Sequence, residues 1–249
     1  MITIAVCAQK GGVSKTTTAE ALILGLRRKG FSVLAMDLDQ QGNLTNYLNP
    51  NAKYSVFDLV YGKVNPKDCV ENDLIAGGLG LRYLPEFFKE NELTELGAAV
   101  KRTKTNYDFL IIDTPPAINT VVLSALANCD YVVMPTEPTK DALDGIMKTL
   151  QAVDATKGRI NPKIKVLGIL LVKYKERYTL HRQFKEALSN SKKFKVFNTV
   201  IRESQAINTA KTANVDFFSK QFARANAVID YAAFVDEVID RIGVKVPNK

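Results

Sequence analysis

The chain has 249 residues, of which 46% are hydrophobic and 24% are charged, a composition that is ordinary for a globular protein. Its three cysteines, Cys7, Cys69 and Cys129, are too few and too widely spaced for a disulfide framework, so a reducing cytoplasm fits best. No apolar run approaches the roughly 18 residues of a membrane helix, and the first residues lack the charged start of a signal peptide.

Strand-like and helix-like segments alternate along the chain. A short apolar run, Ile2–Cys7, precedes a helical pattern over Lys15–Lys29, in which apolar residues recur every three or four positions. The region 49–105 is less regular, and we expect shorter helices there around one strand near Leu81–Leu84. Further strands are predicted at Val33–Met36, Phe109–Ile112, Tyr131–Met134, Ile164–Val172 and Val196–Ile201.

This alternation predicts an α/β fold with a doubly wound, mostly parallel sheet and helices on both of its faces. Polar residues gather just after the predicted strands, where open α/β sheets bind their ligands. These polar segments are Gln9–Thr17, Asp37–Asn43, Asp113–Pro116, Thr136–Thr139 and Arg202–Gln205.

The segment Gln9–Thr17 is a glycine-bearing turn between a strand and a helix. Such a turn directs backbone N–H groups and the positive end of the helix dipole at one spot, which suits a polyphosphate. Lys15 would reach the outer phosphates and the Thr16 hydroxyl would ligate Mg²⁺. The common string G-x-x-x-x-G-K-[ST] is not met, because Gln9 and Ser14 occupy its glycine positions. A glycine turn with incidental lysines is therefore the alternative.

The segment Lys10-Gly11-Gly12-Val13-Ser14-Lys15-Thr16-Thr17 resembles the deviant Walker A motif of the ParA/MinD ATPases. Three more segments resemble the switch, Walker B and following strand motifs of that family, in the same order: Asp37–Asn43, Phe109–Pro116 and Val132–Pro138. The chain looks most like ParA/Soj-type partition ATPases, which implies a P-loop NTPase-like fold. Because Met1 lies directly on the first strand, we expect a single ATPase domain over 1–249 without an N-terminal DNA-binding extension.

The resemblance also implies roles for individual residues. Lys10, Lys15 and Asp39 would be catalytic, with Lys10 crossing a homodimer interface to the partner's ATP and Asp39 orienting the attacking water. Mg²⁺ would be held by Thr16, Asp37 and Asp113. ATP would be bound by the loop and, near its adenine, by two residues that follow later strands: Lys10, Gly11, Gly12, Val13, Ser14, Lys15, Thr16, Thr17, Lys173 and Arg202.

Two positions depart from the family pattern, and both bear on the rate of hydrolysis. Ser14 stands where a glycine is commoner, and its Cβ would strain the loop if the backbone there needs a positive φ. Gln40 stands where the family usually has proline. A regulator that holds nucleotide with little turnover is therefore an alternative to an active ATPase.

The net charge of +8 comes from one stretch, since residues 145–225 carry 17 lysines and arginines against five acidic residues. The family resemblance implies binding of non-specific double-stranded DNA in the ATP state, through Arg202 and Arg224, together with a ParB-type partner at the nucleoid. A solvated lysine-rich surface is the alternative. A last helix is predicted over Ala225–Ile242, and its acidic polar face would be repelled by anionic lipid, so no membrane binding is expected.

Two other functions remain open at this point. The same fold could position a protein assembly instead of a plasmid or chromosome. A metal-cluster carrier would need paired cysteines at a dimer interface, and the three cysteines offer no such pair in the sequence. The single histidine, His181, lies on a predicted helix over Tyr178–Leu188 and is expected at the surface.

Overall fold

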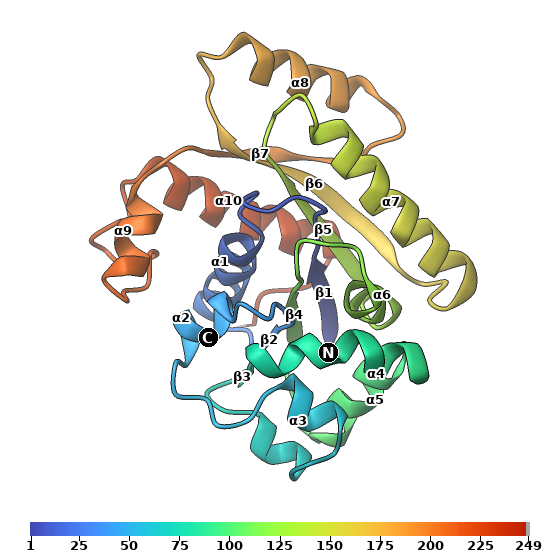
Figure 1. Ribbon diagram of the computed structural model, residues 1–249. Coiled ribbons are helices and arrows are strands. Elements are labelled where there is room, and N and C mark those ends of the chain that lie inside the picture. Colours follow the sequence, from blue (N-terminus) through green and yellow to red (C-terminus); the bar gives the residue numbers. More distant parts are fainter. Residues whose placement is uncertain (248–249) are drawn as a thin grey trace.

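The computed structural model describes residues 1–247, without the side chains of Leu79 and Glu90. Its centre is a seven-stranded sheet in which all strands pair in parallel, in the order β3-β2-β4-β1-β5-β6-β7 (Figure 1). The sheet confirms the predicted fold class. Its strands are β1 (Ile2–Val6), β2 (Val33–Asp37), β3 (Leu74–Ile75), β4 (Phe109–Asp113), β5 (Tyr131–Thr136), β6 (Lys165–Tyr174) and β7 (Val196–Arg202).

Helices cover both faces of the sheet. One face packs against α1 (Lys15–Arg28), α2 (Asn43–Leu48), α9 (Ala206–Thr212) and α10 (Asn226–Ile242). The other face packs against α3 (Val56–Val60), α4 (Leu84–Glu90), α5 (Glu95–Arg102), α6 (Thr120–Ala127), α7 (Ala142–Arg159) and α8 (Thr179–Asn190). Two 3₁₀ helices, η1 (Pro66–Cys69) and η2 (Leu79–Tyr83), complete the described chain.

Alternation along the central strands divides the core in two. In β1, Ile4 and Val6 belong to the cluster under α1 and α10, whereas Ala5 and the following Cys7 belong to the cluster on the opposite face. Because both faces are buried, the strand needs apolar residues at every position. This is why the predicted strands appear as continuous apolar runs.

Helices α1 and α10 are in unusually close contact. A Cβ atom added to Gly25 of α1 would lie 2.5 Å from Cγ2 of Val235 in α10, so only glycine fits there. About two turns before Gly25 in α1 and one turn before Val235 in α10, the hydroxyl groups of Thr18 and Tyr231 lie 3.3 Å apart. The last helix confirms the one predicted from the sequence and is locked against the first.

The strand predicted near Leu81–Leu84 is wrong. That segment is the 3₁₀ helix η2 followed by α4, and the edge strand is instead the two-residue β3. Pro85 occupies the first turn of α4, a position that proline favours. Leu81 and Leu84 are both buried at a spacing of three residues, which fits a helical turn better than a strand.

Register places the polar segments at one edge of the sheet. Asp113, the last residue of β4, is the Cα partner of Val6 in β1 and of Asp37 in β2. The segments that follow β1, β2 and β4 therefore leave the sheet side by side, as expected for the carboxyl ends of parallel strands.

Candidate functional site

The loop between β1 and α1 has the backbone of an anion site. Gly12 and Ser14 adopt positive φ angles of 75° and 59°, which curls the chain around its own amide groups. Within the described residues, no acceptor is bonded to the backbone N–H groups from Gly11 to Thr17. A run of unbonded amides at a helix N-terminus attracts a phosphate group through both hydrogen bonding and the helix dipole.

Lys15 lies within this loop. Its side chain is buried, and its Nζ donates a hydrogen bond of 2.9 Å to the carbonyl oxygen of Lys10. Burial lowers the pKa of Lys15, while the carboxylate of Asp113 acts to raise it. The Lys15 ammonium thus bonds back to the start of the loop. An anion bound there would meet both this positive charge and the unbonded backbone amides.

Asp113 is the main indication of a cation site. It is 0% exposed, and neither of its carboxylate oxygens has a hydrogen-bond partner among the described residues. Burial, followed by the charge of Asp37, raises its pKa well above the ordinary value, and the Thr16 hydroxyl opposes this shift. A buried carboxylate without a partner is costly, so the site fits a metal ion held between Asp113 and Thr16.

Asp37 has a different environment, because its oxygens are already bonded. It accepts hydrogen bonds from the backbone N–H groups of Asp39 (3.0 Å) and Thr45 (2.9 Å) and from the Thr45 hydroxyl (2.9 Å). Burial raises its pKa to about 6. The Thr45 hydroxyl also accepts from the N–H of Gly77 (2.7 Å). Asp37 thus ties the segment after β2 to α2 and to the chain after β3.

Asp39 and Lys10 differ in exposure and in their partners. Asp39 is 9% exposed and its Oδ1 accepts a hydrogen bond of 3.0 Å from the N–H of Gln41. Lys10 is exposed, and its Nζ donates to the Thr139 hydroxyl at 3.1 Å. The Lys10 ammonium is therefore bonded to the segment that follows β5, whereas the Lys15 ammonium is bonded within the loop.

A buried ion pair next to the loop was not predicted from the sequence. Glu20 in α1 is only 1% exposed, and its Oε2 lies 2.6 Å from the Nζ of Lys211 in α9. Lys211 also donates to the Thr17 hydroxyl at 3.0 Å. Burial raises the pKa of Glu20 to about 7, against the effect of Lys211. The only signal in the sequence is an acidic residue among apolar neighbours on the buried face of α1.

Comparison with known proteins decides the family. Residues 1–166 match the family described as "AAA domain". Over 96% of both chains, the sequence is 32% identical to the chromosome-partitioning ATPase Soj of Thermus thermophilus. The chain belongs to the ParA/Soj-type ATPases. The resemblance read from the loop and strand motifs is therefore confirmed.

Other relatives agree with this family. The sporulation initiation inhibitor protein Soj of Bacillus subtilis is 32% identical over 83% of this chain and 86% of its own. A cobyrinic acid a,c-diamide synthase of Mycobacterium smegmatis, solved with an ATP analogue and magnesium, has a TM-score of 0.85, 25% identity, and coverage of 100% and 98%. A putative plasmid partition protein of Borrelia burgdorferi, bound to AMPPNP, shares the fold with a TM-score of 0.79, at 22% identity and 97% and 98% coverage. The expectation of ATP and Mg²⁺ agrees with the ligands of these neighbours.

Of the residues predicted near adenine and DNA, Lys173 and Arg202 lie at the ends of later strands in this ParA/Soj-type chain. Lys173 adopts a positive φ of 51°, and its Nζ lies 3.5 Å from Oε2 of Glu137. Arg202 ends β7, and its guanidinium holds the Asp230 carboxylate with two bonds of 2.9 and 2.7 Å. Arg224 is exposed, two residues before α10. Their roles stay predictions.

The expectation that His181 is a surface residue is wrong. It is 7% exposed, lies next to the rings of Tyr174 and Tyr178, and its Nδ1 accepts a hydrogen bond of 3.1 Å from the N–H of Lys175. Burial lowers its pKa. The histidine fixes the turn between β6 and α8, a structural role that a lone residue in a basic stretch did not reveal.

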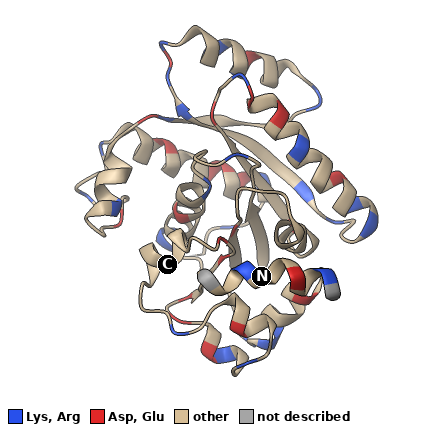
Figure 2. Cartoon of the chain, in the orientation of Figure 1, with Lys and Arg blue, Asp and Glu red and all other residues tan. Residues whose placement is uncertain are grey.

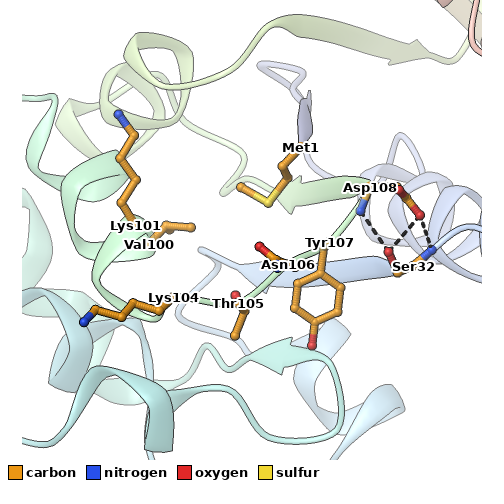
Figure 3. Close-up of a pocket in the computed structure, with 9 residues that line it drawn as sticks. All are labelled: Met1, Ser32, Val100, Lys101, Lys104, Thr105, Asn106, Tyr107 and Asp108. Atoms are coloured by element: carbon orange, nitrogen blue, oxygen red, sulfur yellow. Dashed lines mark hydrogen bonds between the residues drawn. The ribbon is translucent and has the colours of Figure 1, made fainter.

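A cavity at the amino edge of the sheet has no part in this site. It measures about 770 Å³ and is lined by residues from the starts of β1 and β4 and from the end of α5 (Figure 3). Its carboxylate, Asp108, is already bonded to the Ser32 N–H and hydroxyl, each at 2.8 Å. The amino groups of Lys101 and Lys104 point away from that carboxylate in Figure 3.

The cysteines bear on the metal-cluster alternative. Cys7, Cys69 and Cys129 are all free and buried, so none presents a thiol at a surface that two subunits could share. Across residues 1–247, no three His, Cys, Asp or Glu side chains gather as a metal site. The same residues include no helix that is both long and apolar enough to cross a membrane.

Proposed function

We propose that this ParA/Soj-type chain is a Mg²⁺-dependent ATPase whose ATP state is a homodimer that binds double-stranded DNA without sequence preference. One observation carries the proposal: unbonded loop amides and the unpartnered carboxylate of Asp113 meet at one edge of the sheet. The amides need an anion and the carboxylate needs a cation. Mg²⁺ with ATP would satisfy both groups at once.

The chain's own residues divide the work of binding. The amides from Gly11 to Thr17 and the ammonium of Lys15 would hold the outer phosphates. Thr16 and Asp113 would hold Mg²⁺, which when bound offsets the negative charge of the phosphates. Asp37 would act mainly by fixing the segment that carries Asp39, since its oxygens already accept three hydrogen bonds.

Asp39 and Lys10 would supply the steps beyond binding. Asp39 would orient the attacking water, because it lies on the segment that Asp37 fixes beside the loop. Lys10 would cross to the ATP of the partner subunit, where its charge offsets the repulsion between two facing nucleotides. Among the described residues its exposed ammonium is bonded only to the Thr139 hydroxyl, so it is free to do so at small cost.

DNA binding would come from the basic stretch, including Arg202 and Arg224. Contacts with phosphates carry little sequence information, and dimerisation would double them, so affinity should rise with ATP. A ParB-type protein would be the partner that stimulates turnover, and the protein would be cytoplasmic and associated with the nucleoid. The names of two relatives, a chromosome-partitioning ATPase and a plasmid partition protein, support this assignment.

The test is retention of the protein on DNA with ATP, with ADP and without nucleotide, across a series of salt concentrations. We expect retention with ATP and Mg²⁺ alone, falling steeply with salt because counterions are released on binding. Equal retention in all three states would contradict the proposal.

A regulator with little turnover is the second candidate, and Ser14 favours it. Its φ of 59° is a conformation that a side chain with a Cβ adopts at a cost, next to the catalytic lysine. Ser14→Gly should raise the turnover rate if this strain limits hydrolysis. A third candidate is the positioning of a protein assembly. Its test is whether a protein assembly, and not a plasmid or chromosome, loses its normal position in cells that lack the protein.

A further inference from the structure

An open groove of about 450 Å³ lies between α7, the start of β6 and the segment before β7. Its floor is apolar, and the side chains that form it are Met147, Leu150, Ile164, Val166 and Phe194. All except Ile164 are only partly buried, so apolar surface remains in contact with water. This volume lies within the range of about 300 to 1,000 Å³ that is usual for binding pockets.

Four lysines surround this floor: Lys157, Lys165, Lys193 and Lys195. All four are exposed, and none forms an ion pair with any acidic side chain that the structure describes. Asp154 is the one acidic residue among those that line the groove. Figure 2 shows basic residues on α7 and on the chain around α8 and β6, in the part of the molecule that holds the groove. The rim is therefore strongly positive and free to bind.

The groove is separate from the nucleotide site. Lys165 pairs with Tyr131, and both are the first residues of their strands, so the groove lies at the amino ends of β5 and β6. The phosphate loop instead follows the carboxyl end of β1. A ligand in the groove and a nucleotide at the loop can thus be bound at the same time.

We infer that this groove is a docking site for an acidic segment of a partner protein, in which carboxylates flank large apolar side chains. The apolar side chains would cover the floor, and the carboxylates would meet the lysines of the rim. Apolar burial at the centre with polar contacts at the edge is the usual organisation of a protein interface. The unpaired lysines would set the specificity and speed of association through their charge.

The shape of the groove argues against two other classes of ligand. DNA would meet the lysines through its phosphates but would leave the apolar floor uncovered. A membrane is entered by apolar side chains that protrude, whereas here they line a groove and are less exposed than the lysines that line it with them. The inference does not depend on nucleotide chemistry, so it can fail while the proposed function holds.

The experiment uses the full chain and a fluorescein-labelled synthetic helical peptide, with leucines along one face and glutamates on the flanks. A second peptide has lysine in place of each glutamate. Binding is followed by fluorescence anisotropy at low salt. We expect the glutamate peptide to bind and the lysine peptide not to bind.

Variants then separate the rim from the floor. Lys165→Glu combined with Lys193→Glu should weaken binding by about tenfold or more, because attraction becomes repulsion. Leu150→Ala should weaken binding by about fivefold through loss of apolar contact. Lys192→Glu is the matched control, since Lys192 is exposed beside Lys193 but does not line the groove. It should change affinity by less than about twofold. Unchanged ATP binding checks that each variant is folded.

Several results would overturn the inference. One is absence of binding by the glutamate peptide. Another is an equal loss for Lys192→Glu and for the rim variant, which would indicate attraction to overall charge. A third is an unchanged affinity in Leu150→Ala together with displacement of the peptide by duplex DNA or by phosphatidylglycerol vesicles, which would assign the lysines to a polyanion instead.

Discussion

The carboxyl edge of the central strands and the basic region from α7 to β7 use charge in opposite ways. At the edge, Lys15, Glu20, Asp37 and Asp113 are all buried, and the oxygens of Asp113 have no described partner. In the basic region, lysines are numerous, mostly exposed and mostly without an ion-pair partner among the described residues. Buried charges cost much free energy unless a specific partner is present, whereas exposed charges are solvated and cost little.

Because of this difference, we expect the two regions to respond differently to substitution. Each buried group at the edge acts on one ligand in one geometry, so losing it should remove a whole step. Groups in the basic region act together through their summed field, so losing one should have a graded effect. The following predictions test that contrast, from the largest expected effect to the smallest.

Lys15→Ala should abolish tight ATP binding, with a loss of about 100-fold or more, because it removes the one buried ammonium among the loop amides. Titration with a fluorescent ATP analogue measures this. Lys148→Ala, an exposed lysine of α7, is the control and should bind ATP normally. Retained tight binding in Lys15→Ala would contradict the assignment of the loop.

Lys10→Ala should keep ATP binding by the monomer but lose ATP-dependent dimerisation, because the Lys10 ammonium is exposed and bonded to Thr139, outside its own loop. Light scattering with and without ATP measures the change in mass. Lys140→Ala, which removes an exposed lysine next to Thr139, serves as the matched control. A Lys10→Ala dimer of normal affinity would remove Lys10 from the interface.

Asp113→Asn should separate stability from function. It removes a buried charge that lacks partners, so the ligand-free protein should gain on the order of 1 kcal/mol in unfolding free energy near pH 8. Magnesium-dependent ATP binding should weaken at the same time. Urea unfolding and nucleotide titration measure the two effects. Asp154→Asn, at an exposed position, should change neither.

Arg224→Ala should reduce DNA affinity only a few-fold at low salt and lower the salt slope by about one. Arg202→Ala should have a smaller effect on DNA, because Asp230 already holds its guanidinium. Retention on DNA across a salt series distinguishes the two. Loss of all binding in either variant would show that the basic region depends on one residue and not on its summed field.

Glu20→Gln should change the pH dependence of stability. The folded-state pKa of Glu20 is raised to about 7 from an ordinary value of 4.5, so the folded protein binds a proton more tightly than the unfolded chain. Stability should therefore fall as pH rises from about 4.5 to about 7, by roughly 3 kcal/mol. Urea unfolding at several pH values should show a flatter profile for Glu20→Gln and no change for the exposed Glu186→Gln.

Much of the fold and of the phosphate loop could be predicted, because their signals are local. Continuous apolar runs give buried parallel strands, and a glycine turn between a strand and a helix gives the loop. From the sequence, the Cβ of Ser14 is expected to strain the loop only if the backbone there has a positive φ, and the structure shows such an angle.

What could not be predicted depends on contacts between distant segments. Lys211 meets Glu20 across most of the chain length, and Thr45 and Gly77 enclose Asp37 from two other segments. Tertiary packing also decides the burial of His181 and the helical state of the segment after β3. A periodicity within a short window does not contain that information.

The close contact at Gly25 couples the positions of α1 and α10. The Val235 side chain of α10 packs directly against the backbone of α1 at Gly25, and because protein interiors are densely packed, a displacement of one helix would be transmitted to the other. Helix α10 also carries Asp230, whose carboxylate accepts hydrogen bonds from both the backbone N–H and the guanidinium of Arg202. A displacement of α10 would therefore also reach β7, the last strand of the sheet. The absence of a side chain at Gly25 thus allows a contact that connects the helix after the phosphate loop with the edge strand β7.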